Sequence, residues 1–435
     1  MTRLPDEVET RPWQEQQTAD DASYRTQLEY LLARSSFYRD KLGAAGVASA
    51  QAAGGLAEIA ALPLTEKSEL KATATPDNSV GTHLCVPRED IVRIYSTSGT
   101  TGTPSYIPLT ASDLDSWVTG SARSYGASGA SPGERIVSTY GAGPFVAGAA
   151  LAAFDRIGLG HIPLGTSGSE RLLTAIELLK PEIVVLTPSY GAHLLEVAAK
   201  RGVDLAGSSV ARVLVAGEPG GGEPAFRARL ERGWGATVTE AMGIGDIGPS
   251  LWGECEQQDG MHLGARGFVH PELIDPESGR ALALEDGASG ELVLTHLRHE
   301  AAPLLRFRTR DHVQVRVGSC RCGRTGPRVR CIGRTDDMLI VRGVNVFPSA
   351  LREVVSAFAP QVSGHILVRP RSAGVKQEPP LPVSVELAEG CAPDDSLAES
   401  IRERLRGVLV IQTDVQLVPW GSLERSNYKS KLVQH

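Results

Sequence analysis

The chain has 435 residues, of which 41% are hydrophobic and 22% charged, and its formal net charge is −7. This length exceeds one ordinary core, so two or three domains are expected, and the negative charge argues against a general nucleic-acid or anionic-membrane surface. No apolar stretch is long enough to span a bilayer, the N-terminus lacks a signal-peptide h-region, and six cysteines do not form a secreted disulfide framework, so the cytoplasm is the expected compartment.

The first 130 residues predict helices around one short strand and a polar loop. Apolar residues recur at helical spacing between residues 20 and 75, so helical hairpins are expected there, with Thr65 as the N cap of the last helix. Residues 91–95 are apolar and predict a strand. The segment 96–105, made almost entirely of Ser, Thr and Gly, follows it, and another helix is expected over 113–125.

The segment 96–105 is typical of a loop that binds phosphate. Glycine lets the backbone turn tightly and approach a ligand, and hydroxyl and N–H groups donate to phosphate oxygens. A flexible linker is the alternative, but a linker needs neither a preceding strand nor the Pro104 that sets the exit. The loop is not a Walker motif, because no Gly-Lys-Ser/Thr follows.

Strands and helices alternate between residues 136 and 240. Strands are expected at 136–140, 161–164, 183–186 and 213–216, and helices at 145–158, 169–179, 190–201 and 224–233. Continuous apolar strands that alternate with helices predict a doubly wound, largely parallel sheet, whose ligands bind at the carboxyl ends of the strands. The candidate site segments are therefore the turns at 141–143, 187–190, 217–219 and 242–243.

The rest of the chain predicts a β-rich subdomain and a small separate domain. Apolar and polar residues alternate in a β-rich pattern from about 262 onward, which suits a distorted barrel or a second sheet. A domain boundary is expected within 333–337. The expected domains are an N-terminal domain over 1–334 and an α+β domain over 335–435. In the second, a helix is expected over 348–358, a hairpin over 365–387, and a helix after Asp394 with Leu397, Ile401 and Leu405 on one face.

Two charged or glycine-rich motifs have two interpretations each, and the basic tail has one. Residues 243–248 match the G-x-G-x-x-G dinucleotide fingerprint, but Pro249 and a polar run follow them where a helix is required. A strand-end turn that carries Asp246 fits better, and such a carboxylate can hold Mg²⁺ near a triphosphate. The segment 306–311 is either a solvated strand face or a nucleotide contact through Asp311. The tail 424–431 by itself predicts a disordered basic end.

Two loops together contain three cysteines and one histidine, which make a complete tetrahedral zinc set. These residues are Cys255, His262, Cys320 and Cys322. Free thiols in loops are the alternative, because C-x-C is a less common ligand spacing than C-x₂-C. A zinc ion here would be structural and would join the two loops. Ordinary buried or semi-exposed thiols are expected at Cys85, Cys331 and Cys391.

Several motifs follow one another in a recognisable order. They are the segments 62–67, 96–104, 187–190, 217–219, 307–311, 320–324, 333–338 and 342–348. From about residue 20 to the end, this series resembles the adenylate-forming (acyl-CoA synthetase) superfamily, and specifically its phenylacetate–CoA ligase-like branch. The resemblance implies an α/β fold with a large N-terminal domain of doubly wound mixed sheets, a β-rich subdomain, and a small mobile α+β C-terminal domain.

The resemblance implies two half-reactions. A carboxylate attacks the α-phosphate of Mg-ATP and gives an acyl-adenylate and pyrophosphate, and a thiol, usually that of CoA, then displaces AMP. The implied ligands are ATP, Mg²⁺, CoA as co-substrate and a structural Zn²⁺. The implied partners are small molecules, with no nucleic acid and no membrane, and a homodimer is the candidate assembly.

The resemblance also assigns roles to residues. Lys429 is the implied catalytic lysine for adenylation, Asp246 the implied Mg²⁺ acid, and Asp336 the hinge between domains. The implied cradle of the β- and γ-phosphates is Ser96, Thr97, Ser98, Gly99, Thr100, Thr101 and Gly102. The rest of the implied ATP site is Gly217, Glu218, Pro219, Met242, Gly243, Asp311 and Arg334. The acid pocket is expected between Tyr140, Phe145, Ser189, Ala216, Gly248 and Pro249. The implied zinc ligands are the Cys₃His set.

Four positions depart from the family pattern. Thr103 stands where the loop usually has Lys, Met242 where a tyrosine usually stacks on adenine, Asp246 where Glu is usual, and Tyr428 where a glycine usually precedes the mobile lysine. These changes indicate a specialised member, in secondary metabolism, whose expected substrate is an aromatic acid such as an amino- or hydroxybenzoate of the anthranilate type. The alternatives are an adenylating enzyme whose acceptor is an amine, a hydroxyl or a carrier-protein thiol, and a non-catalytic nucleotide-binding protein.

Overall fold

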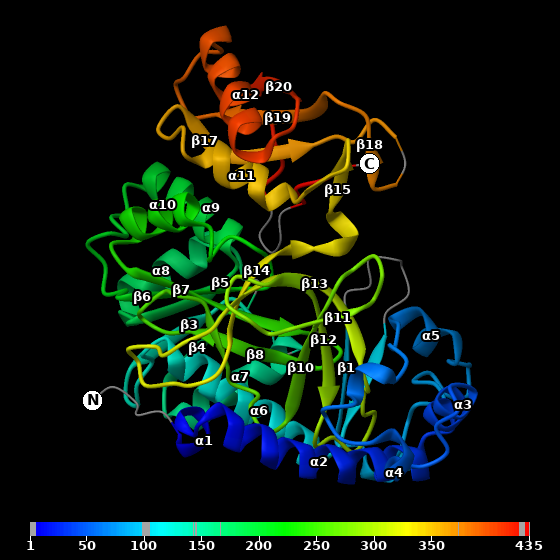
Figure 1. Ribbon diagram of the computed structural model, residues 1–435. Helices are drawn as coiled ribbons and strands as arrows, with labels where there is room; N and C mark the ends of the chain where they lie inside the picture. Colours follow the sequence, from blue (N-terminus) through cyan, green and yellow to red (C-terminus); the bar gives the residue numbers. More distant parts are fainter. Residues whose placement is uncertain are drawn as a thin grey trace. The chain divides into compact units, whose positions relative to one another are not determined.

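The computed structural model describes residues 6–97, 105–141, 143, 146–165, 167–372, 374–425 and 431–434, and Figure 1 traces the chain. The chain divides into two compact units. The first unit consists of Met1–Gly165, Thr239–Thr309 and Val313–Arg330. The second unit consists of Thr166–Val238, Arg310–His312 and Cys331–His435.

Helices dominate the N-terminal part of the first unit, which runs from blue to cyan in Figure 1. They are α1 (Glu7–Thr10), α2 (Trp13–Arg34), α3 (Ser36–Ala44), α4 (Ala50–Ala53), the 3₁₀ turn η1 (Ile59–Ala61), α5 (Lys67–Ala72), η2 (Arg88–Asp90), α6 (Ala111–Ala127) and α7 (Ala147–Ile157). One apolar face of α2, with Tyr24, Leu28 and Leu31, packs against Tyr38 and Leu42 of α3, and all five are nearly inaccessible. The predicted helical hairpins and the helix over 113–125 are confirmed.

The start of α5 differs from the prediction. Thr65 is not the N cap, because it is buried and its hydroxyl donates to the Leu305 carbonyl at 2.7 Å. Glu66 takes the cap position, and its backbone N–H donates to the Glu69 carboxylate at 2.7 Å. A tertiary contact therefore claims the threonine, and the helix begins at Lys67.

The strands of the first unit form parallel and antiparallel pairs. They are β1 (Arg93–Ser96), β2 (Tyr106–Leu109), β3 (Arg135–Ser138), β4 (Gly160–Pro163), β8 (Gly248–Glu254), β9 (Met261–Leu263), β10 (Val269–Ile274), β11 (Ala281–Leu282) and β12 (Ser289–His296). The chain also forms β7 (Thr237–Ile244), β13 (Phe307–Arg316) and β14 (Arg328–Arg334). The β3–β4 pair is parallel, whereas β1–β2, β7–β8, β8–β9, β10–β11 and β10–β12 are antiparallel. The sheet is therefore mixed, as predicted.

The second unit begins with the alternation that the sequence predicts. Its elements here are α8 (Ser169–Leu179), β5 (Ile183–Leu186), α9 (Pro188–Arg201), β6 (Arg212–Ala216) and α10 (Pro224–Trp234), and β5 and β6 pair in parallel. All four residues of β5 are buried, which is typical of a strand covered on both faces. Helix α9 starts cleanly because Thr187 accepts a hydrogen bond from the Tyr190 N–H and Pro188 occupies the first turn.

The C-terminal part of the second unit is a small α+β body (Figure 1, yellow to red). Its elements are η3 (Thr335–Asp337), β15 (Leu339–Val341), β16 (Val344–Val346), α11 (Pro348–Ser356), β17 (Val362–Val368), β18 (Lys376–Gln377), β19 (Leu381–Leu387), α12 (Asp395–Leu409) and β20 (Thr413–Val418). The predicted face of α12, with Leu397, Ile401 and Leu405, is buried against the β17–β19–β20 sheet in one apolar cluster. Asp394 caps that helix, so the predicted start is confirmed.

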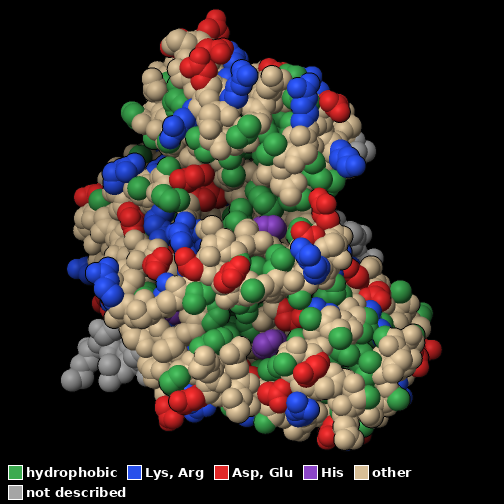
Figure 2. Space-filling model, viewed as in Figure 1, with side chains coloured by type: hydrophobic (Ala, Val, Ile, Leu, Met, Phe, Trp, Pro, Cys, Tyr) green, Lys and Arg blue, Asp and Glu red, His purple; other side chains and the backbone are tan. Residues whose placement is uncertain are grey.

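The surface carries both charge signs. On the face shown in Figure 2, Lys and Arg side chains are intermixed with Asp and Glu, and no broad area of that face carries one sign. Within the described ranges, no helix combines the length and the apolar character needed to cross a bilayer.

Candidate active site

The predicted phosphate loop begins at the end of β1. Ser96 closes the strand and is buried, and Thr97 follows it. The Thr97 N–H donates to the Ser105 carbonyl at 3.0 Å, and the Ser105 N–H donates to Thr97 Oγ1 at 3.4 Å. The β1–β2 hairpin thus holds both ends of the loop. Its central residues Ser98, Gly99, Thr100, Thr101 and Gly102 lie outside the described residues.

Lys67 brings three elements together beside the start of this loop. Its Nζ donates to Asp246 Oδ2 at 2.7 Å and to Thr97 Oγ1 at 3.2 Å. Lys67 begins α5, Thr97 follows β1, and Asp246 lies in the turn between β7 and β8. A Cβ on Gly245 would lie 3.2 Å from Thr97 Cγ2, so this turn packs closely on the loop. An ammonium, a carboxylate and a hydroxyl therefore converge, and these are groups that bind phosphate and Mg²⁺.

The role of Lys67 was not predicted from the sequence. The sequence shows that Thr103 stands where the loop usually has lysine, but Lys67 lies 179 residues from Asp246 along the chain. Two signals pointed to it: Lys67 ends the recognisable segment 62–67, and it follows a Glu that can cap a helix. Neither signal shows which carboxylate the lysine meets.

The predicted strand-end turn that carries Asp246 is shorter than the segment 242–248 in which the sequence predicts it. Residues 245–247 form the turn, with Asp246 at its centre, but Met242 and Gly243 lie within β7, and Gly248 and Pro249 lie within β8. The prediction of a turn at 242–243 is therefore wrong, because pairing with β8 extends β7. A Cβ on Gly243 would collide with the Pro249 carbonyl oxygen, so β7 requires glycine at this position to pair closely with β8. Tyr140 is buried just after β3, and Phe145 lies outside the described residues.

The predicted adenine segment lies in the second unit, after β6. Ala216 ends that strand, and Gly217 follows with a φ of 96°. Glu218 Oε1 accepts a hydrogen bond from the Ser189 N–H at 2.8 Å, which places a carboxylate at the N-terminus of α9. The Ser189 hydroxyl is buried and has no hydrogen-bond partner among the residues that the structure describes.

Arg352 of α11 also holds this segment, and its role was not predicted. Its guanidinium donates to the Pro219 carbonyl at 2.6 Å and to both carboxylate oxygens of Glu223, at 2.6 and 3.0 Å. Gly220 lies against this contact with a φ of 146°, and a Cβ there would meet Pro188 at 2.9 Å. Nothing in the local sequence marks this arginine, because all its partners are more than 100 residues away.

The predicted ribose acid, the arginine expected near ribose or phosphate, and the hinge residue lie together in the second unit. Arg334 Nη1 lies 3.5 Å from Asp311 Oδ1, and Arg334 Nη2 donates to Asp336 Oδ2 at 2.8 Å. Arg334 ends β14 and Asp336 lies in η3 directly after it. Lys429, the implied catalytic lysine, lies outside the described residues.

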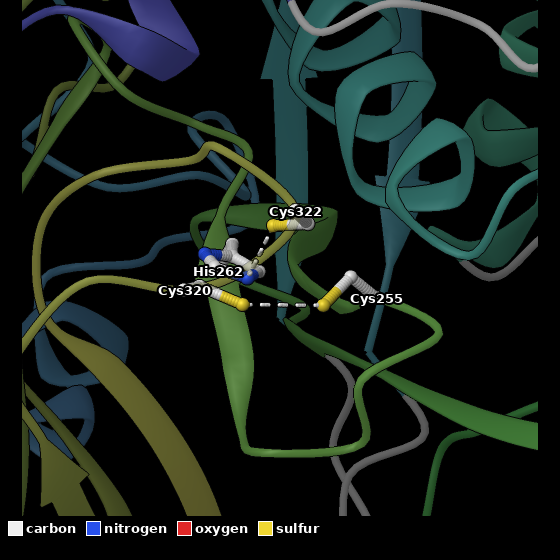
Figure 3. A group of neighbouring side chains, drawn as sticks. All are labelled: Cys255, His262, Cys320 and Cys322. Carbon is white, nitrogen blue, oxygen red and sulfur yellow. Dashed lines mark hydrogen bonds between the residues drawn. The ribbon is translucent and has the colours of Figure 1, made fainter.

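The Cys₃His set comes together in the first unit (Figure 3). The four ligand atoms all lie within 4.8 Å of one another. Cys255 Sγ lies 3.7 Å from Cys320 Sγ, and Cys322 Sγ lies 3.4 Å from His262 Nε2. Two sulfurs bound to one zinc at about 2.3 Å would lie about 3.8 Å apart in a tetrahedron. The donor set and its spacing therefore fit zinc, with Cys255 and His262 from β8–β9 and the other two from the β13–β14 connection.

The thiols of this cluster influence each other's ionisation. The hydrogen bond from Cys255 lowers the pKa of Cys322 strongly, and the neighbouring His262 acts in the same direction. The same hydrogen bond, together with burial, raises the pKa of Cys255. One sulfur is thus favoured as a thiolate, which is the form that binds metal.

Comparison with known proteins decides the family. Residues 25–296 match the AMP-binding enzyme family, and residues 343–435 match the AMP-binding enzyme C-terminal domain. The chain is 34% identical to the phenylacetate-coenzyme A ligase of Escherichia coli, over 98% of this chain and 96% of that protein. It is 33% identical to the protein of the same name from Thermus thermophilus, over 97% and 96% of the two chains.

The chain belongs to the AMP-binding enzyme family, in its phenylacetate–CoA ligase-like branch. As an AMP-binding enzyme of this branch it is an ATP-dependent, AMP-forming acid–CoA ligase that works through an acyl-adenylate. The non-catalytic alternative is thereby set aside.

A solved structure of the same fold is also similar. The 2-hydroxyisobutyryl-CoA ligase in its postadenylation state has a TM-score of 0.90, with 26% identity over 98% of this chain and 91% of that chain. The same ligase in its thioesterification state has a TM-score of 0.72, with 27% identity over 99% and 94%. The adenylate-forming fold predicted from the sequence, with its small C-terminal domain, is therefore confirmed.

Proposed function

We propose that this AMP-binding enzyme activates an aromatic carboxylic acid and transfers it to CoA. The acid oxygen attacks the α-phosphate of ATP, pyrophosphate leaves, and the CoA sulfur then displaces AMP from the acyl carbon. Relatives named phenylacetate-coenzyme A ligase support an aromatic acid. The observation that carries the site assignment is the contact of Lys67 Nζ with both Asp246 and Thr97.

The polyphosphate end of ATP is proposed to lie at this contact. Ser96 to Gly102 would donate to the β- and γ-phosphate oxygens, and Lys67 would supply the cation that Thr103 does not. Asp246 would hold Mg²⁺, which neutralises phosphate charge when it is bound. In the structure Asp246 is paired with one lysine, so binding requires an exchange of one cation for another.

The remaining roles follow the family pattern. Gly217, Glu218, Pro219, Met242 and Gly243 are proposed to bind adenine. Asp311 and Arg334 are proposed to bind the ribose and phosphate. Arg334 pairs with both Asp311 and Asp336, and Asp336 is the proposed hinge between residues 1–334 and 335–435. Lys429 is proposed to neutralise the carboxylate and α-phosphate oxygens as charge develops.

The acid itself is proposed to carry a polar substituent, as in an aminobenzoate of the anthranilate type. The buried Ser189 hydroxyl supports this proposal, because a buried hydroxyl without a partner among the described residues is costly and a substrate amino or hydroxyl group would satisfy it. Tyr140, Phe145, Ala216, Gly248 and Pro249 complete the proposed set of acid-binding residues. Ser189→Ala should then favour phenylacetate or benzoate over anthranilate.

ATP–pyrophosphate exchange tests the acid class. The panel should contain phenylacetate, benzoate, anthranilate, hydroxybenzoates and, as an aliphatic comparison, 2-hydroxyisobutyrate. We expect exchange with aromatic acids. Exchange with 2-hydroxyisobutyrate alone would contradict the aromatic proposal without touching the family assignment.

AMP release with and without CoA tests the acceptor. We expect CoA to accelerate AMP release from the best acid of the panel and to yield the acyl-CoA. An enzyme that releases AMP with an added amine or hydroxyl compound, and is not accelerated by CoA, would have a different acceptor.

Zinc is proposed as the resident metal of the Cys₃His set, where it would tie two loops together. About one zinc per chain is expected in the purified protein, and chelation should lower the melting temperature. His262→Ala should lose the metal and be insensitive to chelator. A metal content near zero in a stable, active protein would contradict this site.

A further inference from the structure

Arg425 is held by two carboxylates at once. Its Nη1 and Nη2 donate to the two oxygens of Glu386 at 2.8 and 2.6 Å. On the other side, its Nε and Nη2 donate to the two oxygens of Glu196 at 3.2 and 3.5 Å. The guanidinium also lies over the Trp420 ring, 4.8 Å from its centre. A planar guanidinium that makes two such bidentate contacts is fixed in position and orientation.

Glu196 is surrounded by cations and imidazoles rather than by solvent. Its side chain is about 10% exposed, and Arg229 Nη2 lies 3.9 Å from Oε1. His365 Nε2 lies 3.6 Å from Oε1, and His193 Nδ1 lies 3.9 Å from Oε2. Burial raises the pKa of Glu196, but His193, His365 and Arg425 outweigh burial and lower the pKa below its ordinary value. The carboxylate is therefore charged near neutral pH and available to hold Arg425.

The two carboxylates belong to different parts of the family's sequence pattern. Glu196 lies on α9, within the match to the AMP-binding enzyme at 25–296, whereas Glu386 lies on β19, within the C-terminal match at 343–435. Arg425 belongs to the C-terminal match and precedes Lys429 by four residues. The Arg425–Glu386 pair is thus internal to the C-terminal body, and the Arg425–Glu196 pair joins that body to α9 within the second unit.

We propose that Arg425 is a positioning residue, and that its pair with Glu196 holds the C-terminal body against α9 and so favours adenylation over thioester formation. This inference rests on the role proposed for Lys429. The similar 2-hydroxyisobutyryl-CoA ligase is known in distinct postadenylation and thioesterification states, and this chain is more similar to the first. A contact between α9 and the C-terminal body favours one of two such states, so it favours one half-reaction over the other.

The test is Glu196→Gln, which removes the link to α9 and leaves the Arg425–Glu386 pair in place. The two half-reactions are measured separately with phenylacetate or the best acid of the panel: pyrophosphate exchange for adenylation, and acyl-CoA formation from supplied acyl-adenylate and CoA. We expect exchange to fall by about tenfold while thioester formation stays within about twofold or increases. Glu196→Asp, which keeps the charge, should recover part of the exchange rate.

Two further variants keep the result interpretable. Arg425→Lys keeps the charge but cannot span both carboxylates. It should therefore also slow pyrophosphate exchange and leave thioester formation nearly unchanged. Glu399→Gln is the matched control, because Glu399 pairs with Arg402 on the exposed side of α12 and should leave both half-reactions unchanged. Thermal unfolding of every variant shows whether the fold is kept.

Equal loss of both half-reactions in Glu196→Gln, or no loss in either, would overturn the proposal. Lys429→Ala separates this outcome from failure of the underlying assignment. If Lys429→Ala abolishes exchange and Glu196→Gln does not slow it, the positioning role of the Arg425–Glu196 pair is wrong, and the catalytic role of Lys429 is supported. If Lys429→Ala retains exchange, the catalytic role of Lys429 is wrong, and the positioning role of Arg425, which rests on it, is wrong too.

Discussion

Asp246 and Glu196 are both carboxylates paired with cations, but their surroundings differ. Asp246 meets the ammonium of Lys67, whose side chain is about one-third exposed. Glu196 meets the fork of Arg425, with Arg229 and two histidines around it. A lysine pair near solvent contributes little stability and can exchange partners, whereas a buried arginine pair leaves an uncompensated charge when it is broken. The first arrangement suits binding a ligand and the second suits holding an element in place.

The largest effect is expected at Lys429, the proposed catalytic lysine. Lys429→Ala should lower ATP–pyrophosphate exchange by about 1000-fold, because a cation placed against developing charge acts on the transition state. Lys431→Ala, two residues further, is the matched control and should have little effect. Undiminished exchange in Lys429→Ala would contradict the catalytic role of Lys429.

A smaller loss is expected at the exchangeable carboxylate. Asp246→Asn should lower exchange by about 100-fold and raise the Mg²⁺ concentration needed for half-maximal rate. Asp246→Glu restores the residue usual in the family and should stay within about tenfold of the unmodified enzyme. If Asp246→Asn needs no more Mg²⁺ than the parent, Asp246 is a structural partner of Lys67.

Substitution of Lys67 tests whether the Lys67–Asp246 pair binds ligand or only stabilises the fold. Lys67→Met should raise KM for ATP and lower exchange by about tenfold, the loss of one charge-assisted contact. Its free energy of unfolding should change by less than about 1 kcal/mol, because the pair is partly exposed. Arg425→Met is the contrasting variant, with a loss of about 3 kcal/mol. Similar stability losses in both would break the distinction between the two pairs.

The smallest effect concerns the acid stability of the anchored pair. Burial raises the pKa of Glu196, yet His193, His365 and Arg425 outweigh it, so the folded protein has a pKa below the ordinary value of 4.5. As the pH falls, Glu196 therefore takes up a proton in the unfolded chain before it does so in the folded protein. The charged Glu196 stabilises the fold above pH 4.5, and this stabilisation is lost as the pH falls below that value. Below that pH, the free energy of unfolding measured with denaturant should fall less steeply with pH in Glu196→Gln than in the unmodified protein. The difference in slope should be up to about 1.4 kcal/mol per pH unit. Parallel curves for the two proteins would contradict this charge state.

Much of the molecule follows from local sequence. Apolar runs and their spacing located β5, β6 and the flanking helices, because burial of a strand or a helix face leaves a period in the sequence. Asp394 predicted the start of α12 by the same local logic, since a capping carboxylate acts within one turn. The four Cys₃His residues were predicted as one set from their ligand types, the family resemblance strengthened that prediction, and the geometry supports it.

Tertiary structure decided which groups meet. Thr65 was drawn into the core instead of capping α5, and Met242 and Gly243 were paired into a strand by β8, because long-range contacts outweighed local turn and cap preferences. Lys67 finds Asp246 across 179 residues, and Arg425 finds Glu196 across 229. Charges separated in this way leave no periodic signal. The sequence by itself therefore determined the fold and the chemistry available to this ligase, and only the folded chain determined that Lys67 pairs with Asp246 and Arg425 with Glu196.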